Sequence, residues 1–262
     1  MPDSMKLAIP CSSCFYLLPD SQRGLNAPRP TYLRELGNTS LYDMTCDRGH
    51  QQRGWLANHK FEILFESGIK ALKDEYYREA VTSFAVALER FYEFSIILLL
   101  MDNFFDENQR LRGLDVLPKF GKFWSKTLKF SERQLGAFCS LYISEFGQIP
   151  LLFDDSELRN KVIHAGYIPT LNEALVFGEG VNKSIKQFCK KYDEKDVGRP
   201  YKRATYVQRV SIALDGLKLK SPLITADYGH MTKVSLFVDA TVDSYFNGSI
   251  TIADYIASMP TS

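Results

Sequence analysis

The sequence of 262 residues predicts a mainly α-helical protein with a metal-binding N-terminal segment and a small C-terminal appendage. Three observations favour this fold class. Apolar residues recur at spacings of three and four over much of the stretch from Phe61 to Tyr192, which is the period of amphipathic helices. Residues 1–58 lack that period and contain two pairs of potential metal ligands. Beyond residue 205 the pattern suits short helices and short strands equally well.

The composition is that of an ordinary globular protein, with 45% hydrophobic and 24% charged residues. A net charge of +1 provides no overall attraction to nucleic acid, so any affinity for RNA requires local basic patches. The longest apolar run, Ser95–Met101, is far shorter than the roughly 20 residues of a membrane span. The first ten residues do not resemble a secretory leader. We therefore expect a cytoplasmic protein with no membrane partner.

Two Cys/His pairs distinguish the N-terminal segment. Cys11 and Cys14 form a Cys-x-x-Cys pair, and Cys46 and His50 form a second pair. Three thiolates and one imidazole make a usual closed tetrahedral zinc site, and such a site can fold a segment that has little apolar material. The pattern resembles a zinc ribbon or treble-clef finger, although the second pair is one residue wider than the commonest knuckle. The alternative is four unrelated residues in a loop-rich arm.

Two adjacent amphipathic helices are expected next, over residues 61–73 and 77–102, and their short link predicts an antiparallel hairpin. Glu89 lies on the second of these helices. It is either part of a solvated edge or the partner of an arginine, which it would fix by a charge-assisted hydrogen bond.

A helix interrupted near Pro118 is expected next. It leads into a basic and aromatic stretch in which Lys122, Trp124 and Lys126 are candidates for RNA binding. Aromatic rings that stack bases and lysines that neutralise phosphates are typical of single-stranded RNA binders, but an ordinary amphipathic helix has the same residues. The pairs Ser131/Gln134 and Thr170/Glu173 have the spacing of capping boxes and should each open a helix.

The stretch from Glu157 to Gly166 combines residues suited to phosphodiester chemistry. A short helix that Asp154, Asp155 or Ser156 could cap is expected here, and Gly166 and Pro169 should end it. His164 can exchange a proton near neutral pH, and Arg159 offers a permanently charged fork to phosphoryl oxygens. These two side chains are about 140° apart around an ideal helix. They can serve one phosphate only through the length of the arginine, a distorted helix or a dimer.

The order Arg159-Asn160-x-x-x-His164 resembles the R-x4–6-H motif of HEPN domains, helical proteins that include many prokaryotic ribonucleases. The resemblance extends over residues 60–192. It implies a HEPN-like bundle, a homodimer with a composite cleft, and metal-independent cleavage of RNA in which Arg159, Asn160 and His164 are catalytic and Glu89 supports them. The zinc would then be structural, and catalysis would need no cofactor.

We therefore expect a zinc-finger-like domain at 1–58, a HEPN-like bundle at 59–195, and a basic linker with a C-terminal appendage at 196–262. The appendage includes Met231–Tyr245 and Ile250–Ile256, each either helix or strand. The family association suggests phage defence by abortive infection, or a toxin, with a phage-derived trigger or an antitoxin as partner. The alternative is a non-catalytic dimerisation module that binds nucleic acid or protein.

Overall fold

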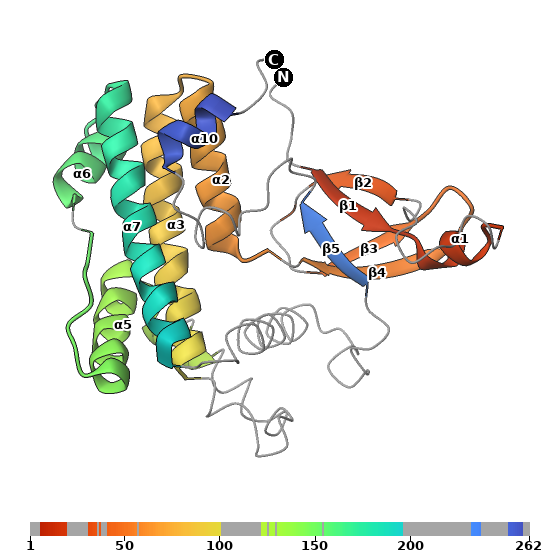
Figure 1. Ribbon diagram of the computed structural model, residues 1–262, viewed down its shortest axis with the longest axis horizontal. Coiled ribbons are helices and arrows are strands. Elements are labelled where there is room, and N and C mark those ends of the chain that lie inside the picture. Colours follow the sequence, from red (N-terminus) through yellow and green to blue (C-terminus); the bar gives the residue numbers. More distant parts are fainter. Residues whose placement is uncertain are drawn as a thin grey trace. The chain divides into compact units, whose positions relative to one another are not determined.

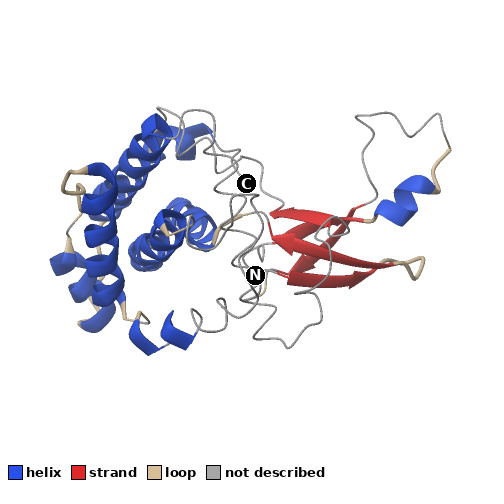
Figure 2. Ribbon diagram, turned by 90° about the horizontal axis from the view of Figure 1, so that it is seen from below, coloured by secondary structure: helices blue, strands red, loops and turns tan. Residues whose placement is uncertain are grey.

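The computed structural model describes residues 6–19, 31–35, 37, 41–56, 58–100, 122–124, 126–128, 130–153, 155–195, 232–236 and 251–258. The described chain is mainly helical, as predicted. It divides into two compact units, one that contains the N-terminal strands and one that begins at His59 (Figures 1 and 2).

The N-terminal unit is a five-stranded sheet with a short helix, α1, at Ser12–Tyr16. Its strands are β1 (Lys6–Pro10), β2 (Thr31–Glu35), β3 (Leu41–Thr45), β4 (Gln51–Leu56) and β5 (Thr232–Leu236). The strand order is β2-β1-β5-β4-β3. The central strand β5 is antiparallel to β1 and parallel to β4, so it joins the β1/β2 pair to the β3/β4 hairpin.

The β3/β4 hairpin has an inner and an outer face. Tyr42 and Met44 are buried, whereas the alternate residues Asp43 and Thr45 are exposed, which is the alternation of a half-buried strand. The Tyr42 hydroxyl donates to the carbonyl of Gly37 and accepts from its N–H, both at 3.1 Å. β3 therefore has a defined inner face up to its end at Thr45, and Cys46 follows directly.

The second unit is a helical bundle around the long helix α3, which packs against α2, α5, α6 and α7. Its helices are α2 (Lys60–Lys73), α3 (Tyr77–Leu99), α5 (Ser131–Phe146), α6 (Ser156–His164), α7 (Leu171–Lys195) and α10 (Ile252–Ser258). The predicted hairpin of α2 and α3 is confirmed. Figure 1 shows α2, α3 and α7 side by side, and the shorter α6 packs against α3.

Aromatic rings fill the interior between α3, α5 and α7. Phe138 lies within ring-contact distance of Phe91, Tyr92 and Phe188, with centroids 6.5, 5.0 and 5.7 Å away. Such clusters bury large apolar areas, and their tilted arrangements are the favoured ones. The bundle core is thus made by the apolar stripes that the helical period predicts.

Phe84 on α3 packs into a space that two glycines leave open. A Cβ atom added to Gly68 on α2 would lie 2.6 Å from the Phe84 ring, and one added to Gly178 on α7 would lie 2.7 Å from it. Phe84 is fully buried and cannot move into solvent. Both neighbouring helices therefore need glycine where they approach this ring.

We expect Gly178→Ala to destabilise the bundle by about 1–3 kcal/mol, the usual cost of overpacking a core. Gly136 on α5 offers the matched control, because nothing lies within 4 Å of a Cβ added there. Gly136→Ala should stabilise the protein by about 0.5–1 kcal/mol through helix propensity. Urea unfolding of both variants measures the two changes, and equal effects would contradict the close approach at Phe84.

The two predicted capping boxes have different outcomes. The Thr170 N–H donates to Glu173 Oε2 at 2.7 Å and the Glu173 N–H donates to Thr170 Oγ1 at 3.3 Å, so this box is confirmed. The box at Ser131 is wrong, because α5 begins one residue earlier, with Phe130 as its N-cap. Gln134 is buried, and its side-chain amide donates to the Leu128 carbonyl at 2.7 Å instead.

The described parts of the predicted C-terminal appendage lie in different units. Strand β5 occupies part of the predicted 231–245 element and belongs to the N-terminal sheet. Helix α10 packs on the bundle, with Ile252 fully buried and its N–H 2.5 Å from Glu179 Oε1. The interrupted helix predicted around Pro118 and the basic linker that follows residue 195 lie outside the described residues.

Candidate functional site

Cys11, Cys14, Cys46 and His50 come together in the N-terminal unit, with ligand atoms all within 4.8 Å of one another. His50 Nδ1 lies 3.9 Å from Cys11 Sγ, 3.3 Å from Cys14 Sγ and 3.4 Å from Cys46 Sγ. The thiols of Cys14 and Cys46 are 3.6 Å apart. Tetrahedral zinc with ordinary bond lengths separates two sulfurs by about 3.8 Å and a sulfur from a nitrogen by about 3.6 Å. The four side chains therefore have the spacing of a tetrahedral metal site.

The first ligand pair lies where β1 passes into α1. Cys11 follows Pro10 at the end of the strand and is the N-cap of the helix, where its Sγ accepts the Cys14 N–H at 3.4 Å. The Phe15 N–H donates to the Cys11 carbonyl at 3.1 Å. This turn presents both buried thiols on the same side.

The second ligand pair closes the β3/β4 hairpin. Thr45 pairs with Gln51, so Cys46 and His50 are the next opposed positions, and the Cys46 N–H donates to the His50 carbonyl at 3.0 Å. Gly49, at φ +79°, donates its N–H to the Cys46 carbonyl at 2.8 Å. Opposed positions point to one face. The hairpin thereby explains the spacing that is one residue wider than a common knuckle.

The donor set suits zinc. Thiolates and imidazole are preferred zinc ligands, and four of them leave no open position for a reacting water. Burial raises the pKa of Cys46, but hydrogen bonds from the backbone of Arg48 and His50 and from the thiols of Cys14 and Cys11 lower it to about 6. The cluster can hold a metal ion, and its closed donor set is that of a structural site.

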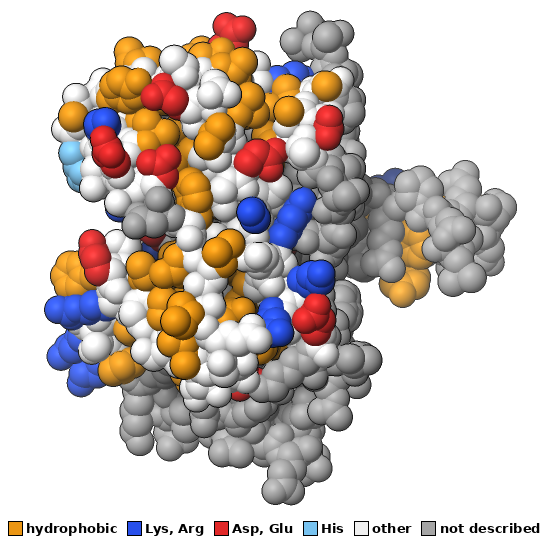
Figure 3. Space-filling view, turned by 60° about the vertical axis from the view of Figure 1, so that its left-hand side comes forward, with side chains coloured by type: hydrophobic (Ala, Val, Ile, Leu, Met, Phe, Trp, Pro, Cys, Tyr) orange, Lys and Arg blue, Asp and Glu red, His pale blue; other side chains and the backbone are white. Residues whose placement is uncertain are grey.

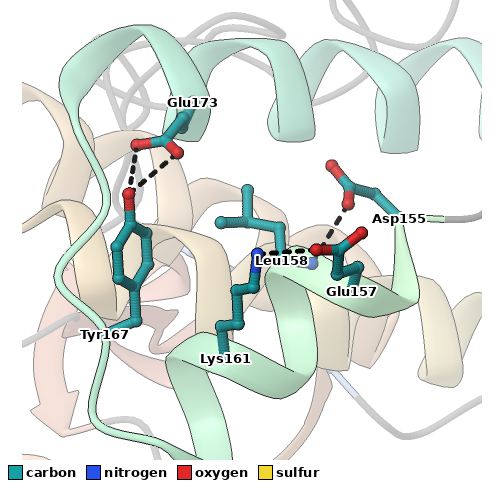
Figure 4. Close-up of polar contacts among 6 residues, drawn as sticks. All are labelled: Asp155, Glu157, Leu158, Lys161, Tyr167 and Glu173. Carbon is teal, nitrogen blue, oxygen red and sulfur yellow. Dashed lines mark hydrogen bonds and ion pairs between the residues drawn. The ribbon is translucent and has the colours of Figure 1, made fainter.

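The second candidate centre is α6, whose ends are fixed locally (Figure 4). Asp155 is the N-cap, and its Oδ1 accepts the Leu158 N–H at 3.1 Å. Gly166, at φ +68°, follows the last turn, and the Tyr167 N–H donates to the Lys161 carbonyl at 3.1 Å. The predicted start and end of the helix are confirmed.

Arg159 is joined to Glu89 across 70 residues of sequence. Its guanidinium donates to Glu89 Oε1 in a half-buried ion pair between α6 and α3. The contact itself is therefore present, and its use in catalysis stays a prediction. A single carboxylate oxygen occupies one of the five guanidinium N–H groups, so the others can serve a phosphate. Glu93, one turn further, pairs with Arg90 at 2.5 Å.

Asn160 and His164 are exposed on the same helix, one turn apart. Within the described residues, neither side chain has a hydrogen bond or ion pair, and no contact joins His164 to Arg159. His164 is the last residue of α6 and is followed by a loop that Tyr167 anchors to Glu173, with oxygen distances of 3.0 and 3.2 Å (Figure 4). Sequence reasoning missed this tyrosine, because an isolated Tyr in a loop carries no motif.

Exposed apolar side chains flank α6 on both sides in the sequence. Ile149 is 84% exposed before the helix and Ile168 is 75% exposed after it, and Leu151, Leu171 and Val176 are also exposed. Figure 3, which turns the α5 and α6 side of the bundle forward, shows hydrophobic side chains at the surface between acidic and basic ones. No periodicity signalled these residues, since they lie mostly in loops.

The three predicted RNA-binding residues differ in exposure. Lys122 and Lys126 are exposed, one turn apart on a short helical segment. Trp124 between them is half-buried, and its carbonyl accepts the Leu128 N–H at 2.9 Å. A role for the two lysines in RNA binding fits their exposure and remains a prediction.

The contacts of His59, at the start of the helical unit, indicate a structural role. The centre of its ring lies 4.5 Å from that of the Phe94 ring and 5.8 Å from that of the Phe61 ring. The backbone N–H of His59 donates to Glu62 Oε2 at 2.6 Å. Burial of the ring lowers its pKa to about 4, so the imidazole is neutral at physiological pH. It is therefore unsuited to acid-base catalysis near neutrality.

This lowered pKa predicts an acid-dependent loss of stability. His59 binds a proton near pH 6.5 in the unfolded chain but only near pH 4 in the folded protein. The contribution of neutral His59 to the free energy of unfolding is therefore fully present above pH 6.5 and is lost as the pH falls toward 4. The loss should be about 1–3 kcal/mol. His59→Phe should remove it, which urea unfolding at pH 7 and pH 5 can measure. If the parent and His59→Phe lost the same free energy of unfolding between pH 7 and pH 5, His59 would not be the group responsible.

Comparison with protein-family models, with curated proteins and with solved structures found no match for this chain. Among the described residues, none of the helices combines the length and apolar character that crossing a membrane requires.

Proposed function

We propose that this protein is an endoribonuclease that cleaves RNA without a catalytic metal ion. The observation that carries the proposal is one short helix, α6, that presents Asn160 and His164 to solvent and holds Arg159 by an ion pair to Glu89. Arg159, Asn160 and His164 have the order of the R-x4–6-H motif of HEPN ribonucleases, which this stretch resembles. The assignment of the helical unit to that fold is part of the same proposal.

Each side chain has a distinct role in the proposed reaction. His164 takes the proton from the ribose 2′-hydroxyl, or gives one to the leaving 5′-oxygen. Arg159 stabilises the negative charge that builds on the phosphorane, and Glu89 fixes the guanidinium for that task. Asn160 orients the scissile phosphate. The products carry a 2′,3′-cyclic phosphate and a 5′-hydroxyl, and DNA is not cleaved because it lacks the nucleophile.

The proposed enzyme acts as a homodimer in which two α6 helices meet. Arg159 and His164 share no contact within the described residues, so a second copy can supply the missing partner. The first turn of α6 is acidic through Glu157 and its last turn is basic through Lys161 and His164. A twofold axis between antiparallel helices places each acidic turn opposite a basic one. The exposed apolar residues that flank α6 supply surface for burial.

The metal site has a structural role in this proposal, because its four protein ligands leave no position for substrate. The biological setting we propose is phage defence or toxin-type growth arrest in the cytoplasm, with a phage-derived trigger or an antitoxin. This setting rests on the family resemblance alone.

The test is incubation of the purified protein with total cellular RNA in excess EDTA, followed by analysis of fragment ends. We expect cyclic phosphate ends, and no cleavage of an oligonucleotide with a 2′-deoxy group at the scissile position. If neither the protein alone nor the protein with phage-infected extract cleaves RNA, the alternative of a non-catalytic binding module replaces the enzyme.

A further inference from the structure

Two phenylalanines are exposed at the junction that leads into α5. Phe123 is 51% exposed on the helical segment at residues 122–124, and Phe130 is 46% exposed just before α5. Phenylalanine is among the residues most often buried. Two exposed rings so close in the sequence therefore call for a ligand that uses them.

Arg133 connects the segment that carries Phe123 with Phe130. Its guanidinium lies 4.9 Å from the centre of the Phe130 ring and also donates to the Thr127 backbone carbonyl at 3.3 Å. Thr127 is one helical turn beyond Phe123. One arginine therefore joins the turn that follows the first exposed ring to the second exposed ring.

The interior side of the junction is anchored independently. Leu128 is buried, its N–H donates to the Trp124 carbonyl at 2.9 Å, and its own carbonyl accepts from the Gln134 side chain at 2.7 Å. These contacts anchor the junction on its interior side, and the two phenylalanines remain at the surface. The exposure of the rings is therefore a consequence of how the junction is built.

Positively charged residues alternate with the two rings along the chain. Lys122 and Lys126 are exposed one turn apart, and Arg133 adds a third positive charge and a planar stacking surface. The one acidic residue among the described positions 122–134 is Glu132. Exposed rings alternating with cations match a chain of unpaired bases joined by phosphates. An acidic peptide would use the cations but would leave the rings without a counterpart.

We propose that Lys122, Phe123, Lys126, Phe130 and Arg133 form an aromatic-cationic platform that binds single-stranded RNA. Phe123 and Phe130 stack bases, with the Arg133 guanidinium plane beside the second ring, and the lysines contact phosphates. Stacking does not distinguish bases, so binding tolerates different sequences. The inference rests on the proposed function in one respect, because it identifies the platform as the surface that holds the substrate strand.

The platform is tested by fluorescence anisotropy with a labelled oligouridylate. The full-length His164→Ala protein is the parent, so that the probe is not cleaved. Phe123→Ala and Phe130→Ala should each weaken binding about fivefold to a hundredfold. Lys126→Gln should reduce the slope of log affinity against log salt by about 0.7. Tyr76→Ala, which removes another exposed aromatic ring, is the matched control and should change nothing.

Several outcomes would overturn the platform. They are failure of the parent to bind the oligouridylate, equal affinity for duplex RNA of the same length, or unchanged binding by the phenylalanine variants. Ultraviolet crosslinking of the parent, with identification of the crosslinked peptides, covers the case in which a variant misfolds, because RNA should attach to residues 122–133.

Failure of the platform and failure of the proposed nuclease are separate results. If the wild-type protein cleaves RNA neither alone nor with phage-infected extract but binding depends on both rings, the enzyme is excluded and the platform stands. If RNA is cleaved normally by the phenylalanine variants and bound equally well, the platform is excluded and the enzyme stands.

Discussion

Loss of Cys14, a candidate metal ligand, should unfold the N-terminal sheet and leave the helical bundle folded. Cys14 Sγ lies within 3.6 Å of both Cys46 Sγ and His50 Nδ1, so Cys14→Ser removes a central ligand of the cluster. Structural zinc contributes about 10–16 kcal/mol of binding free energy in finger peptides, more than the whole stability of most domains.

Hydrogen exchange followed by mass spectrometry reports on the two units separately. In Cys14→Ser, peptides covering β3 and β4 should lose protection, while peptides covering α2, α3 and α7 keep it. Elemental analysis should show about one zinc per parent chain and little in the variant.

Cys139→Ser is the matched control, because this thiol lies in α5 outside the cluster and is half-buried. It should leave both zinc content and protection of the strands unchanged. Full protection of β3 and β4 in a metal-free Cys14→Ser protein would show that the sheet folds without the site.

Local chemistry explains what could be predicted from the sequence about this site. Cys11, Cys14, Cys46 and His50 were identifiable because zinc accepts few residue types and because the ligands occur as close pairs. The geometry of the second pair was not predictable, since it depends on a hairpin whose register ends at Thr45 and Gln51.

Non-local pairing explains what could not be predicted. Strand β5 joins the N-terminal sheet from near residue 232, and a short apolar stretch does not reveal its partners. The capping pair at Ser131 failed for a similar reason, because buried Gln134 finds the Leu128 carbonyl. Thr170 is exposed and Glu173 is half-buried, and the Glu173 carboxylate keeps the local cap while it also accepts from the Tyr167 hydroxyl.

The helical period located Glu89 and α6 but left the relation between them open. A solvated edge was the commoner expectation for Glu89, and the ion pair with Arg159 is a contact across 70 residues. Likewise, the aromatic pattern near residue 124 did not distinguish a half-buried Trp124 from exposed Phe123, because the interrupted helix gives no single apolar face.

His164→Ala should reduce RNA cleavage by about 10²- to 10⁴-fold without unfolding the protein, because it removes a general acid or base from an exposed position. Arg159→Ala should cost about 10²- to 10³-fold through loss of charge stabilisation. The half-buried ion pair with Glu89 contributes about 0–1 kcal/mol to stability, so this variant should also remain folded. Lys183→Ala, which removes an exposed lysine of α7 outside the proposed site, is the control and should cleave normally.

Glu89→Gln distinguishes a positioning role from a structural one. It keeps an acceptor for Arg159 but removes the charge that holds the guanidinium, so cleavage should fall by about tenfold to a hundredfold while the unfolding midpoint barely changes. A loss of cleavage matched by an equal loss of stability would assign the pair to the fold alone.

Mixing the two inactive variants tests the composite site directly. If Arg159 of one chain acts with His164 of its partner, a mixed dimer of Arg159→Ala and His164→Ala contains one site with both residues intact. Random exchange of subunits makes about half of the dimers mixed, so about a quarter of the parent activity should return. If both residues act within one chain, every site in the mixture lacks one of them and no activity returns. Recovery on mixing would therefore establish that α6 works across a dimer, whereas a lack of recovery with exchange verified by native mass spectrometry would exclude it.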